Sequence, residues 1–297
     1  ESFMIQAAEK YPDVQFCHAT GTQAHTKNLK NFHNAFASIY EGRYLAGIAA
    51  GMKLNAMIKE GKFEAKDAKI GYVGAYPYAE VKSGYTAFFL GVRSVCKEAT
   101  MEVQFTGSWY NEAKEKEAAT LLIGRGCKLI SQHADSMGAP TACESAGVPN
   151  VSYNGSTLDA CPNTFIVSSR INWVPYMKYM IECVRDNKAI DTDWCKGINE
   201  GAVELTPINE KVAAPGTAEA IKAAEEQFKA GTLHVFDTST FTVDGKTLTS
   251  YMADVDTDEK FTPDTEVISN GYFHESEKRS APYFDVNIDG ITLLNEG

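Results

Sequence analysis

The sequence lacks the features that mark membrane-spanning and nucleic-acid-binding proteins. No stretch approaches the ~18 consecutive apolar residues of a membrane span, and the longest apolar runs, such as 87–92, have the length of buried core segments. No cluster of lysine and arginine is present. Acidic residues number 39 and basic residues 28, which gives a net charge of −11. A chain of this charge is a poor partner for the phosphate backbone, so we expect no binding of nucleic acid.

The motifs of common enzyme classes are also missing. There is no GxSxG elbow, no P-loop and no HExxH motif, and residues 71–75 lack the third glycine of a dinucleotide-binding loop. The six histidines share no metal-ligand spacing. His133 and Asp135 would form an acid–base pair on a strand, but no nucleophile accompanies them. These absences predict a protein that needs no cofactor or metal and catalyses no reaction.

The cysteines form no CxxC pair and no zinc-finger spacing. They are scattered through apolar segments, so we expect buried thiols that pack as small apolar side chains. An odd number leaves at least one cysteine outside any intramolecular disulfide. Free thiols in this number favour a reducing compartment or an anaerobic source. The seven are Cys17, Cys96, Cys127, Cys143, Cys161, Cys183 and Cys195.

What the chain does contain is an alternation of strand-like and helix-like segments. Apolar residues make up 44% of its 297 residues and charged residues 23%, as in ordinary globular proteins, and this length favours two lobes. Short apolar strands separated by helices indicate βαβ units, a parallel sheet and helices on both of its faces. The expected strands are 14–19, 69–74, 103–107, 128–133, 150–154 and 165–169. The expected helices are 3–10, 35–58, 81–96, 112–123, 141–146, 173–187 and 217–230.

The two ends of the chain differ from this pattern. Residues 235–250 alternate and contain Asp244-Gly245, which predicts a β-hairpin. From 254 to 297 the chain is polar and acidic, without a periodicity that predicts an element. At the other end, Glu1 leads directly into a helical pattern without a methionine or a signal sequence. We therefore expect the sequence to be a processed or truncated product.

Aromatic and neutral polar residues follow the predicted strands. Ligands of parallel sheets bind beyond the carboxyl ends of the strands. Aromatic faces stack on planar rings, and Asp and Asn satisfy ring nitrogens and hydroxyls, so the set suits a small, flat ligand with polar edges. Each residue also has a plainer interpretation, as a cover of the sheet end, a core anchor, a helix N-cap or a first-turn packing residue. The set contains Tyr76, Trp109, Asp135, Tyr153, Asn154 and Trp173.

Several short segments share their order and spacing with one known family. They are YEGRYLAG at 40–47, KIGYVG at 69–74, GVRS at 91–94, KEKEAA at 114–119, QHADS at 132–136, NWVPY at 172–176 and EGAVELTP at 200–207. From the first helix to about residue 235, the chain resembles the basic membrane protein (BMP) family. These are the substrate-binding proteins of ABC importers for purine nucleosides and nucleobases.

The resemblance implies a type I periplasmic-binding-protein fold, in which two doubly wound lobes are joined by three crossovers and enclose the ligand. One lobe would contain residues 1–66 and 168–206, and the other 67–167 and 207–297. By the same resemblance, Trp109 would stack on the base and Asp135 would accept hydrogen bonds from its N–H groups. The remaining site residues would be Tyr76, Tyr153, Asn154 and Trp173 in the cleft, with Glu200 as a weaker candidate near a crossover.

The resemblance further implies an extracytoplasmic protein, periplasmic or anchored as a lipoprotein, whose partner is the membrane permease of an ABC importer. Family members carry about two and a half βα units ahead of the equivalent of 2–4, so we expect the native protein to contain such a segment. Seven cysteines are unusual for an exported protein. Three alternatives stay open: the same fold with a sugar or other small metabolite, a purine-processing enzyme, and the sensing domain of a regulator.

Overall fold

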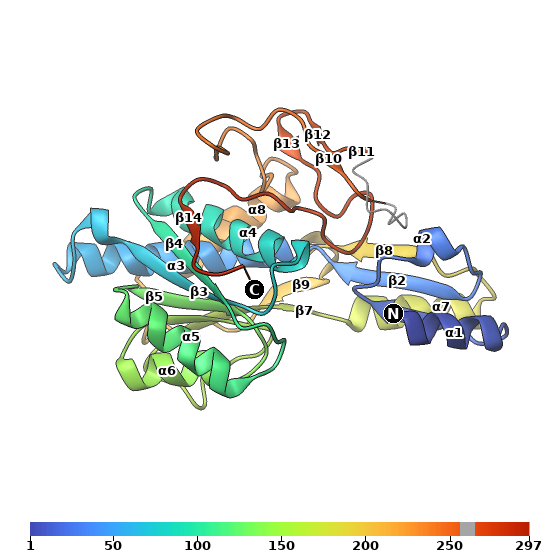
Figure 1. The fold of residues 1–297 in the computed structure, drawn as a ribbon, viewed down its shortest axis with the longest axis horizontal. Coiled ribbons are helices and arrows are strands. Elements are labelled where there is room, and N and C mark those ends of the chain that lie inside the picture. Colours follow the sequence, from blue (N-terminus) through green and yellow to red (C-terminus); the bar gives the residue numbers. More distant parts are fainter. Residues whose placement is uncertain (256–264, 297) are drawn as a thin grey trace.

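Most strands of the protein belong to two separate sheets flanked by helices, shown in Figure 1. The computed structural model describes residues 1–255 and 265–296. The smaller sheet is parallel and has the order β1-β2-β8, and the larger one has the order β14-β4-β3-β5-β6-β7-β9. In the larger sheet the pairing of β7 with β9 is antiparallel, and the other pairings are parallel. The strands of the smaller sheet are β1 (Phe16–Ala19), β2 (Phe32–Ala37) and β8 (Asp193–Lys196). Those of the larger sheet are β3 (Lys69–Gly74), β4 (Thr100–Phe105), β5 (Leu129–His133), β6 (Asn150–Tyr153), β7 (Phe165–Ile171), β9 (Val203–Leu205) and β14 (Ile291–Leu293).

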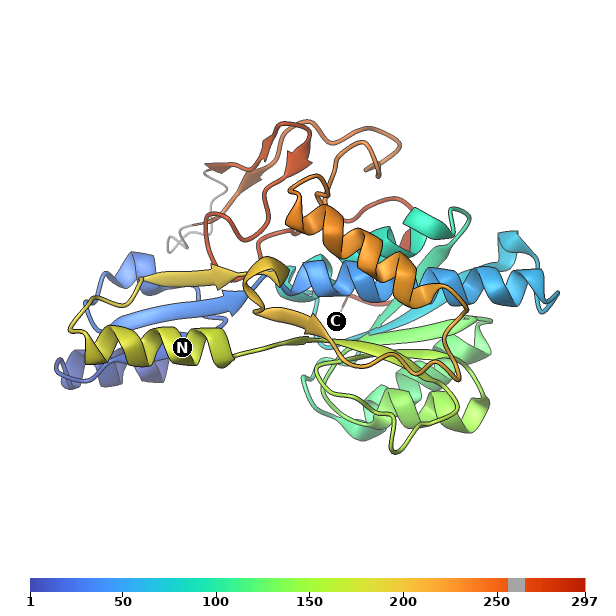
Figure 2. The same cartoon turned by 180° about the vertical axis from the view of Figure 1, so that it is seen from behind.

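Helices cover both faces of the larger sheet, as Figures 1 and 2 show. One face carries α3 (Ile39–Lys59), α4 (Ala79–Val95) and α8 (Thr217–Lys229), and the other carries α5 (Glu112–Gly124) and α6 (Gly138–Ala146). Because both faces are covered, β3 is buried along nearly its whole length. Beside the smaller sheet lie α1 (Ser2–Lys10), α2 (Ala24–Lys27) and α7 (Val174–Arg185). Single 3₁₀ turns occur at Ala65–Asp67 and Ile198–Glu200.

Two glycines allow α3 and α4 to cross with their backbones in contact. A Cβ on Gly47 would lie 2.1 Å from the Phe88 carbonyl oxygen, and one on Gly91 would lie 2.1 Å from that of Tyr44. Only glycine fits at such a crossing, because any side chain would push the helices apart. This packing gives a structural reason for glycine in the segments YEGRYLAG and GVRS.

The residues after α8 cover this helical face. The segment contains the short pairs β10–β11 (Met252–Ala253 and Thr265–Glu266) and β12–β13 (Ile268–Ser269 and Tyr272–Phe273). Its aromatic side chains enter the core, where Phe236 and Phe284 stack with ring centroids 4.3 Å apart. It ends at β14, which pairs with the edge of β4.

Several elements differ from the sequence prediction. A helix was expected from residue 35, but residues 32–37 form β2 and the helix begins at Ile39. Every residue of β2 is buried, so it lacks the alternation that separates a strand from a helix. The strands β8, β9 and β14 are three or four residues long and were not predicted.

The expected hairpin over 235–250 is reduced to one tight turn. Val243 and Lys246 form an isolated bridge around Asp244 and Gly245, both of which have positive φ. The tail without periodicity is nevertheless ordered over 265–296, while its residues 256–264 lie outside the described part. Packing of Phe273 and Phe284 against Phe236, which precedes the tail, and not a local repeat, holds it in place.

The structure places α3 and β7 at the larger sheet, where α3 packs against α4 and β7. The expected boundaries after 66 and before 168 assign both elements to the other lobe. Where a hinge divides the chain stays a prediction. Within residues 1–255 and 265–296 no helix is long and apolar enough to span a bilayer, and no group of His, Cys, Asp and Glu fits a metal ion. All seven cysteines are free thiols, five of them buried and two half-buried.

Candidate ligand-binding site

A cavity of about 420 Å³ lies where the carboxyl ends of the two sheets face each other. The larger sheet contributes most of the lining, and Phe36 at the end of β2 contributes from the smaller one. The structure brings together five of the seven predicted site residues here: Trp109, Asp135, Tyr153, Asn154 and Trp173. The other lining residues are Phe36, Glu80, Arg170 and Ile171.

Trp109 belongs to a cluster of aromatic rings that follows β3 and β4. Tyr76 stacks on Tyr78 at 5.0 Å between ring centroids, and Tyr76 lies 5.6 Å from Trp109. Tyr76 therefore supports the indole from behind, and it is absent from the cavity lining in which sequence reasoning placed it. Tyr76 thus contacts Trp109, and its direct contact with a ligand stays a prediction.

A buried carboxylate fixes the two loops that carry Trp109 and Asp135. Glu115 in the first turn of α5 is fully buried and accepts hydrogen bonds from the backbone N–H groups of Asn111 (3.0 Å) and Ser136 (3.2 Å). The N–H of Asp135 donates to the carbonyl of Trp109 at 2.9 Å. The loops after β4 and β5 are therefore held together before any ligand arrives.

Asp135 lines the cavity and does not cap the following helix. The following helix α6 begins at Gly138 with Met137 at the N-cap position, so the capping interpretation of Asp135 is wrong. Its Oδ1 accepts from the Asn154 side-chain amide at 2.9 Å. Partial burial raises the pKa of the Asp135 carboxyl, and the hydrogen bond from Asn154 opposes that rise. No residue in the described part of the chain donates a hydrogen bond to Oδ2.

His133 is buried beside Trp109 and Tyr153, and its ring makes no hydrogen bond to Asp135. Its ring is buried, lies 4.2 Å from the Tyr153 ring, and packs where a Cβ on Gly84 would come within 2.5 Å. Burial lowers the pKa of the imidazole, which favours its neutral form. Its Nε2 is 3.9 Å from the Glu80 carboxylate, and neither ring nitrogen has a hydrogen-bond partner among the described residues.

Trp173 combines a packing role with exposure to the cavity. It occupies the N-cap position of α7, and its ring lies 6.4 Å from Phe36 and 6.3 Å from Tyr176. It is half-buried and forms the wall on the side of the smaller sheet. Both interpretations of this residue from the sequence are therefore compatible with its position.

Glu200 lies apart from the other predicted residues. Its carboxylate accepts from the backbone N–H of Gly197 at 3.0 Å within the 3₁₀ turn 198–200. It lines a separate polar cavity with Glu41 and Lys196. Glu200 therefore lies outside the cavity of the other candidates, and its contact with a ligand stays a prediction.

Sequence reasoning missed Phe36 and Glu80 as lining residues. Phe36 lies near the end of β2, at a position where the sequence predicts the start of a helix. Glu80 follows the Tyr76–Tyr78 loop, but a glutamate at the start of a helix is common without any ligand, because it suits the helix dipole. If the sequence had indicated that β2 ends at Ala37, Phe36 would have been recognised as a residue at the carboxyl end of a strand.

A family model described as ABC transporter substrate-binding protein PnrA-like matches residues 1–233. A purine-binding protein of Brucella abortus is 30% identical over 74% of this chain and 60% of its own length. A putative ABC transporter glucose-binding protein of Haloferax volcanii is 32% identical over 80% of this chain and 57% of its own. A solute-binding protein of an ABC transporter from Aeropyrum pernix has the same fold, with a TM-score of 0.66 at 16% identity over 78% of this chain and 73% of that one. The chain thus spans about three fifths of the length of these two curated relatives.

Proposed function

This chain belongs to the PnrA-like family of ABC transporter substrate-binding proteins, and from that premise we propose that it captures a purine base or nucleoside. Members of this family bind solutes for transport and do not transform them. The purine-binding relative from Brucella abortus supports a purine as the solute.

The observation that carries the proposal is the pairing of Trp109 with Asp135 in one cavity. The indole offers a flat face to a planar ring, and stacking of a base on an aromatic side chain contributes about 1–3 kcal/mol. Because Asn154 occupies Oδ1 of Asp135, Oδ2 is oriented by that bond and accepts from a ring or exocyclic N–H of the ligand.

We further propose that the whole protein delivers this solute to the membrane permease of an ABC importer. Family members work outside the cytoplasm, so a periplasmic location or a lipoprotein anchor is part of the proposal. Closure of the two sheets around the ligand would expel water and create the surface that the permease recognises.

A second candidate is a sugar, because the Haloferax volcanii relative is named as glucose-binding. Aromatic rings with a carboxylate also occur in carbohydrate sites, where the rings pack against C–H faces and the carboxylate accepts from hydroxyl groups. The two candidates differ in the ligand edge that Asp135 meets, which is N–H for a purine and O–H for a sugar.

The test is a thermal-shift screen of nucleobases, nucleosides, pentoses and hexoses, followed by calorimetry with three variants. Purines should raise the melting temperature of the wild type. Trp109→Ala and Asp135→Ala should each weaken purine binding, by about 10- to 100-fold. Tyr110→Ala is the matched control, because this neighbouring ring is 67% exposed and lies outside the cavity.

Unchanged purine affinity in both site variants would exclude this cavity as the purine site. A shift with hexoses and none with purines would select the sugar candidate instead.

A further inference from the structure

The C-terminal segment, from residue 234 onward, lies outside the family match, which ends at 233. Its described part is fixed to the larger sheet and to the helices on that sheet. Strand β14 pairs with β4, and Asp285 pairs with Lys82 of α4 at 2.5 Å. The ring of Phe236 lies 5.4 Å from that of Tyr40 in α3, measured between centroids. The segment therefore moves with the larger sheet in any change of the angle between the two sheets.

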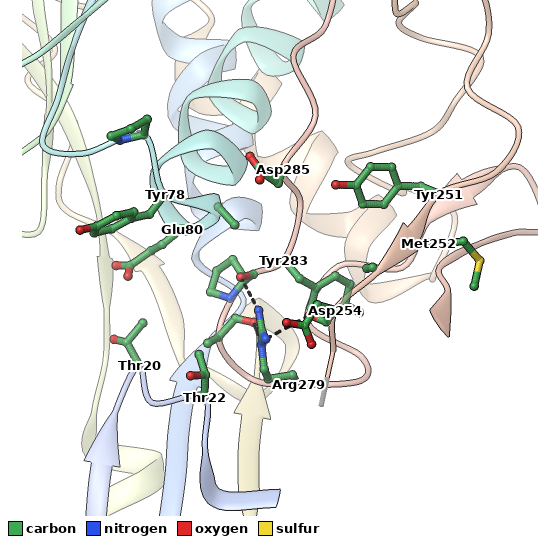
Figure 3. Close-up of a pocket in the computed structure, with 15 residues that line it drawn as sticks. Thr20, Thr22, Tyr78, Glu80, Tyr251, Met252, Asp254, Arg279, Tyr283 and Asp285 are labelled. Carbon is green, nitrogen blue, oxygen red and sulfur yellow. Dashed lines mark hydrogen bonds between the residues drawn. The ribbon is translucent and has the colours of Figure 1, made fainter. Parts of the chain in front are cut away.

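A loop of this segment, residues 275–285, is held in shape by two buried charged side chains. Glu275 is 2% exposed, and its carboxylate accepts from the backbone N–H groups of Tyr283 and Phe284, each at 2.9 Å. Arg279, shown in Figure 3, is also buried and donates at 3.1 Å to two carbonyl groups of the same loop. Because these bonds fix the backbone of the loop, its remaining N–H groups have set positions.

The N–H group of Ser280 in this loop reaches the smaller sheet. It donates to the carboxylate of Asp193, the first residue of β8, at 3.1 Å. The Asp193 side chain is 4% exposed, and the same carboxylate oxygen lies 3.3 Å from Nε2 of His25 in α2. The C-terminal segment thus contacts both sheets: it is packed and paired with the larger one, and it meets the smaller one through this polar contact.

Two cavities lie between the C-terminal segment and the smaller sheet. One, of about 550 Å³, separates Thr20 after β1 from residues 251–254 and 279–285, as Figure 3 shows. The other, of about 690 Å³, separates Lys196 at the end of β8 from residues 275–280. Since close packing is interrupted on both sides, the position of the smaller sheet against the segment depends strongly on the polar contact between them.

This contact is linked to the ligand cavity through the pairing of two strands. Asp193 of β8 is aligned with Asn34 of β2, two residues before Phe36. Phe36 is the residue through which β2 lines the ligand cavity. Strands that are paired in one sheet move together. A shift of Asp193 away from Ser280 would therefore also shift Phe36 relative to the larger sheet, and so change the width of the cavity.

We propose that the C-terminal segment is a strap that sets the position of the smaller sheet, with the Ser280–Asp193 hydrogen bond as its point of attachment. Asp193 lies outside the ligand cavity and is a positioning residue, because it acts through the placement of Phe36. The inference goes beyond the proposed function, since it holds for any solute that is enclosed between the two sheets.

The test measures the distance between the two sheets in the full chain by pulsed electron paramagnetic resonance. Spin labels are attached through non-natural amino acids at Lys116 of α5 and Lys178 of α7, which are both exposed, so that the native thiols stay unmodified. The wild type should give one narrow distance distribution. Asp193→Ala should lower the ratio of this arrangement to all others by about 10-fold, because a hydrogen bond to a charged acceptor is lost.

Two further variants separate the strap from a general loss of structure. Asp193→Asn keeps a side-chain oxygen that accepts from Ser280, so its distribution should match that of the wild type. His25→Ala is the matched control, because it removes the other partner of Asp193 and leaves the bond from Ser280 in place. Equal distributions in the wild type and Asp193→Ala would overturn the proposal, and so would an equal broadening in His25→Ala.

Amide hydrogen exchange of the wild type, measured by NMR, decides the question even if Asp193→Ala fails to fold. The N–H of Ser280 should exchange at least about 10-fold more slowly than in an unstructured peptide, because exchange requires the attachment to open. An unprotected N–H at Ser280 would show that the segment does not hold the smaller sheet at this point, and would overturn the proposal.

Discussion

The helices on the two sheets are packed very differently. Helix α4 on the larger sheet buries 11 of its 17 residues, whereas α7 beside the smaller sheet buries only Tyr176 and Cys183 among its 12. The outer face of α7 exposes Val174, Ile181 and Val184 at 62–68%. The larger sheet therefore holds the loops of Trp109 and Asp135 on a rigid support, while the smaller sheet supplies a thinner opposing wall.

The dense packing of the larger sheet is clearest at Arg43 of α3. This buried side chain joins four strands of the larger sheet. It is fully buried and donates to the Ser131 hydroxyl at 2.7 Å, the Tyr72 hydroxyl at 3.0 Å and the Ser152 carbonyl at 3.2 Å. It also donates to the Ser169 hydroxyl at 3.3 Å. Its donors thus reach β3, β5, β6 and β7 directly beneath the site.

Arg43→Ala should lower the free energy of unfolding by about 3–5 kcal/mol, because it leaves a cavity and several unpaired buried acceptors. Urea denaturation measures this change. Arg125→Ala is the control: its side chain is 45% exposed and pairs with Glu102, so the expected loss is below ~1 kcal/mol. Equal losses in the two variants would mean that the larger sheet does not depend on its buried arginine.

Glu41 connects the helices on the larger sheet with the turn after the smaller sheet, so its substitution tests that connection. This residue of α3 accepts from the backbone N–H of Ile198 at 2.7 Å, on the turn that follows β8. Burial raises the pKa of Glu41 to about 7, and the nearby Glu200 carboxylate adds to the rise. The folded protein therefore retains a proton at pH values where the unfolded chain, with a pKa near 4.3, has lost it.

Its contribution to stability is fully present below the unfolded pKa and is lost as pH rises through the folded pKa. Between pH 5 and 8, the wild type should lose up to about 3 kcal/mol relative to Glu41→Gln. Chemical denaturation of both proteins at several pH values gives the difference, in which other titrating groups cancel. Parallel pH profiles would show that Glu41 ionises as it does in water.

The smallest effect is expected on the exposed face of α7. Ile181→Ser should change the free energy of unfolding by no more than about 0.5 kcal/mol, because the side chain is 66% exposed. The matched change Leu122→Ala, on a fully buried side chain of α5, should cost about 2–5 kcal/mol. Urea denaturation of both variants measures the two changes. A large loss of stability in Ile181→Ser would mean that the outer face of α7 is packed as tightly as the helices on the larger sheet.

The sequence was sufficient for the five central strands of the larger sheet, β3 to β7. These strands are short apolar runs separated by long helices, and this pattern can be recognised from the sequence alone. It was insufficient for β2, whose continuous burial reads equally well as helix, and for β14, whose partner β4 lies about 190 positions away. Pairings at that distance leave no local signal.

The site shows a similar division. Residues directly after strands, such as Trp109, Asp135 and Asn154, were identified because the topology of a parallel sheet places them at one edge. Glu80 and Glu115 were not, since one adjoins a helix start and the other is a buried acid within a helix. Burial of an acidic side chain depends on the loops that pack around it, and those loops come from other parts of the chain.

The pairing of β14 with β4 bears on the order in which the molecule assembles. Ile291 aligns with Met101, and the Asn295 side chain donates to and accepts from the backbone of Phe105 at 3.0 and 2.8 Å. Until residues 291–295 have left the ribosome, the outer edge of β4 has no partner, although β3 on its other side, and β5 beyond β3, are already complete. A nascent chain would thus carry an open strand edge through most of its synthesis, the kind of edge to which chaperones and other unfolded chains bind.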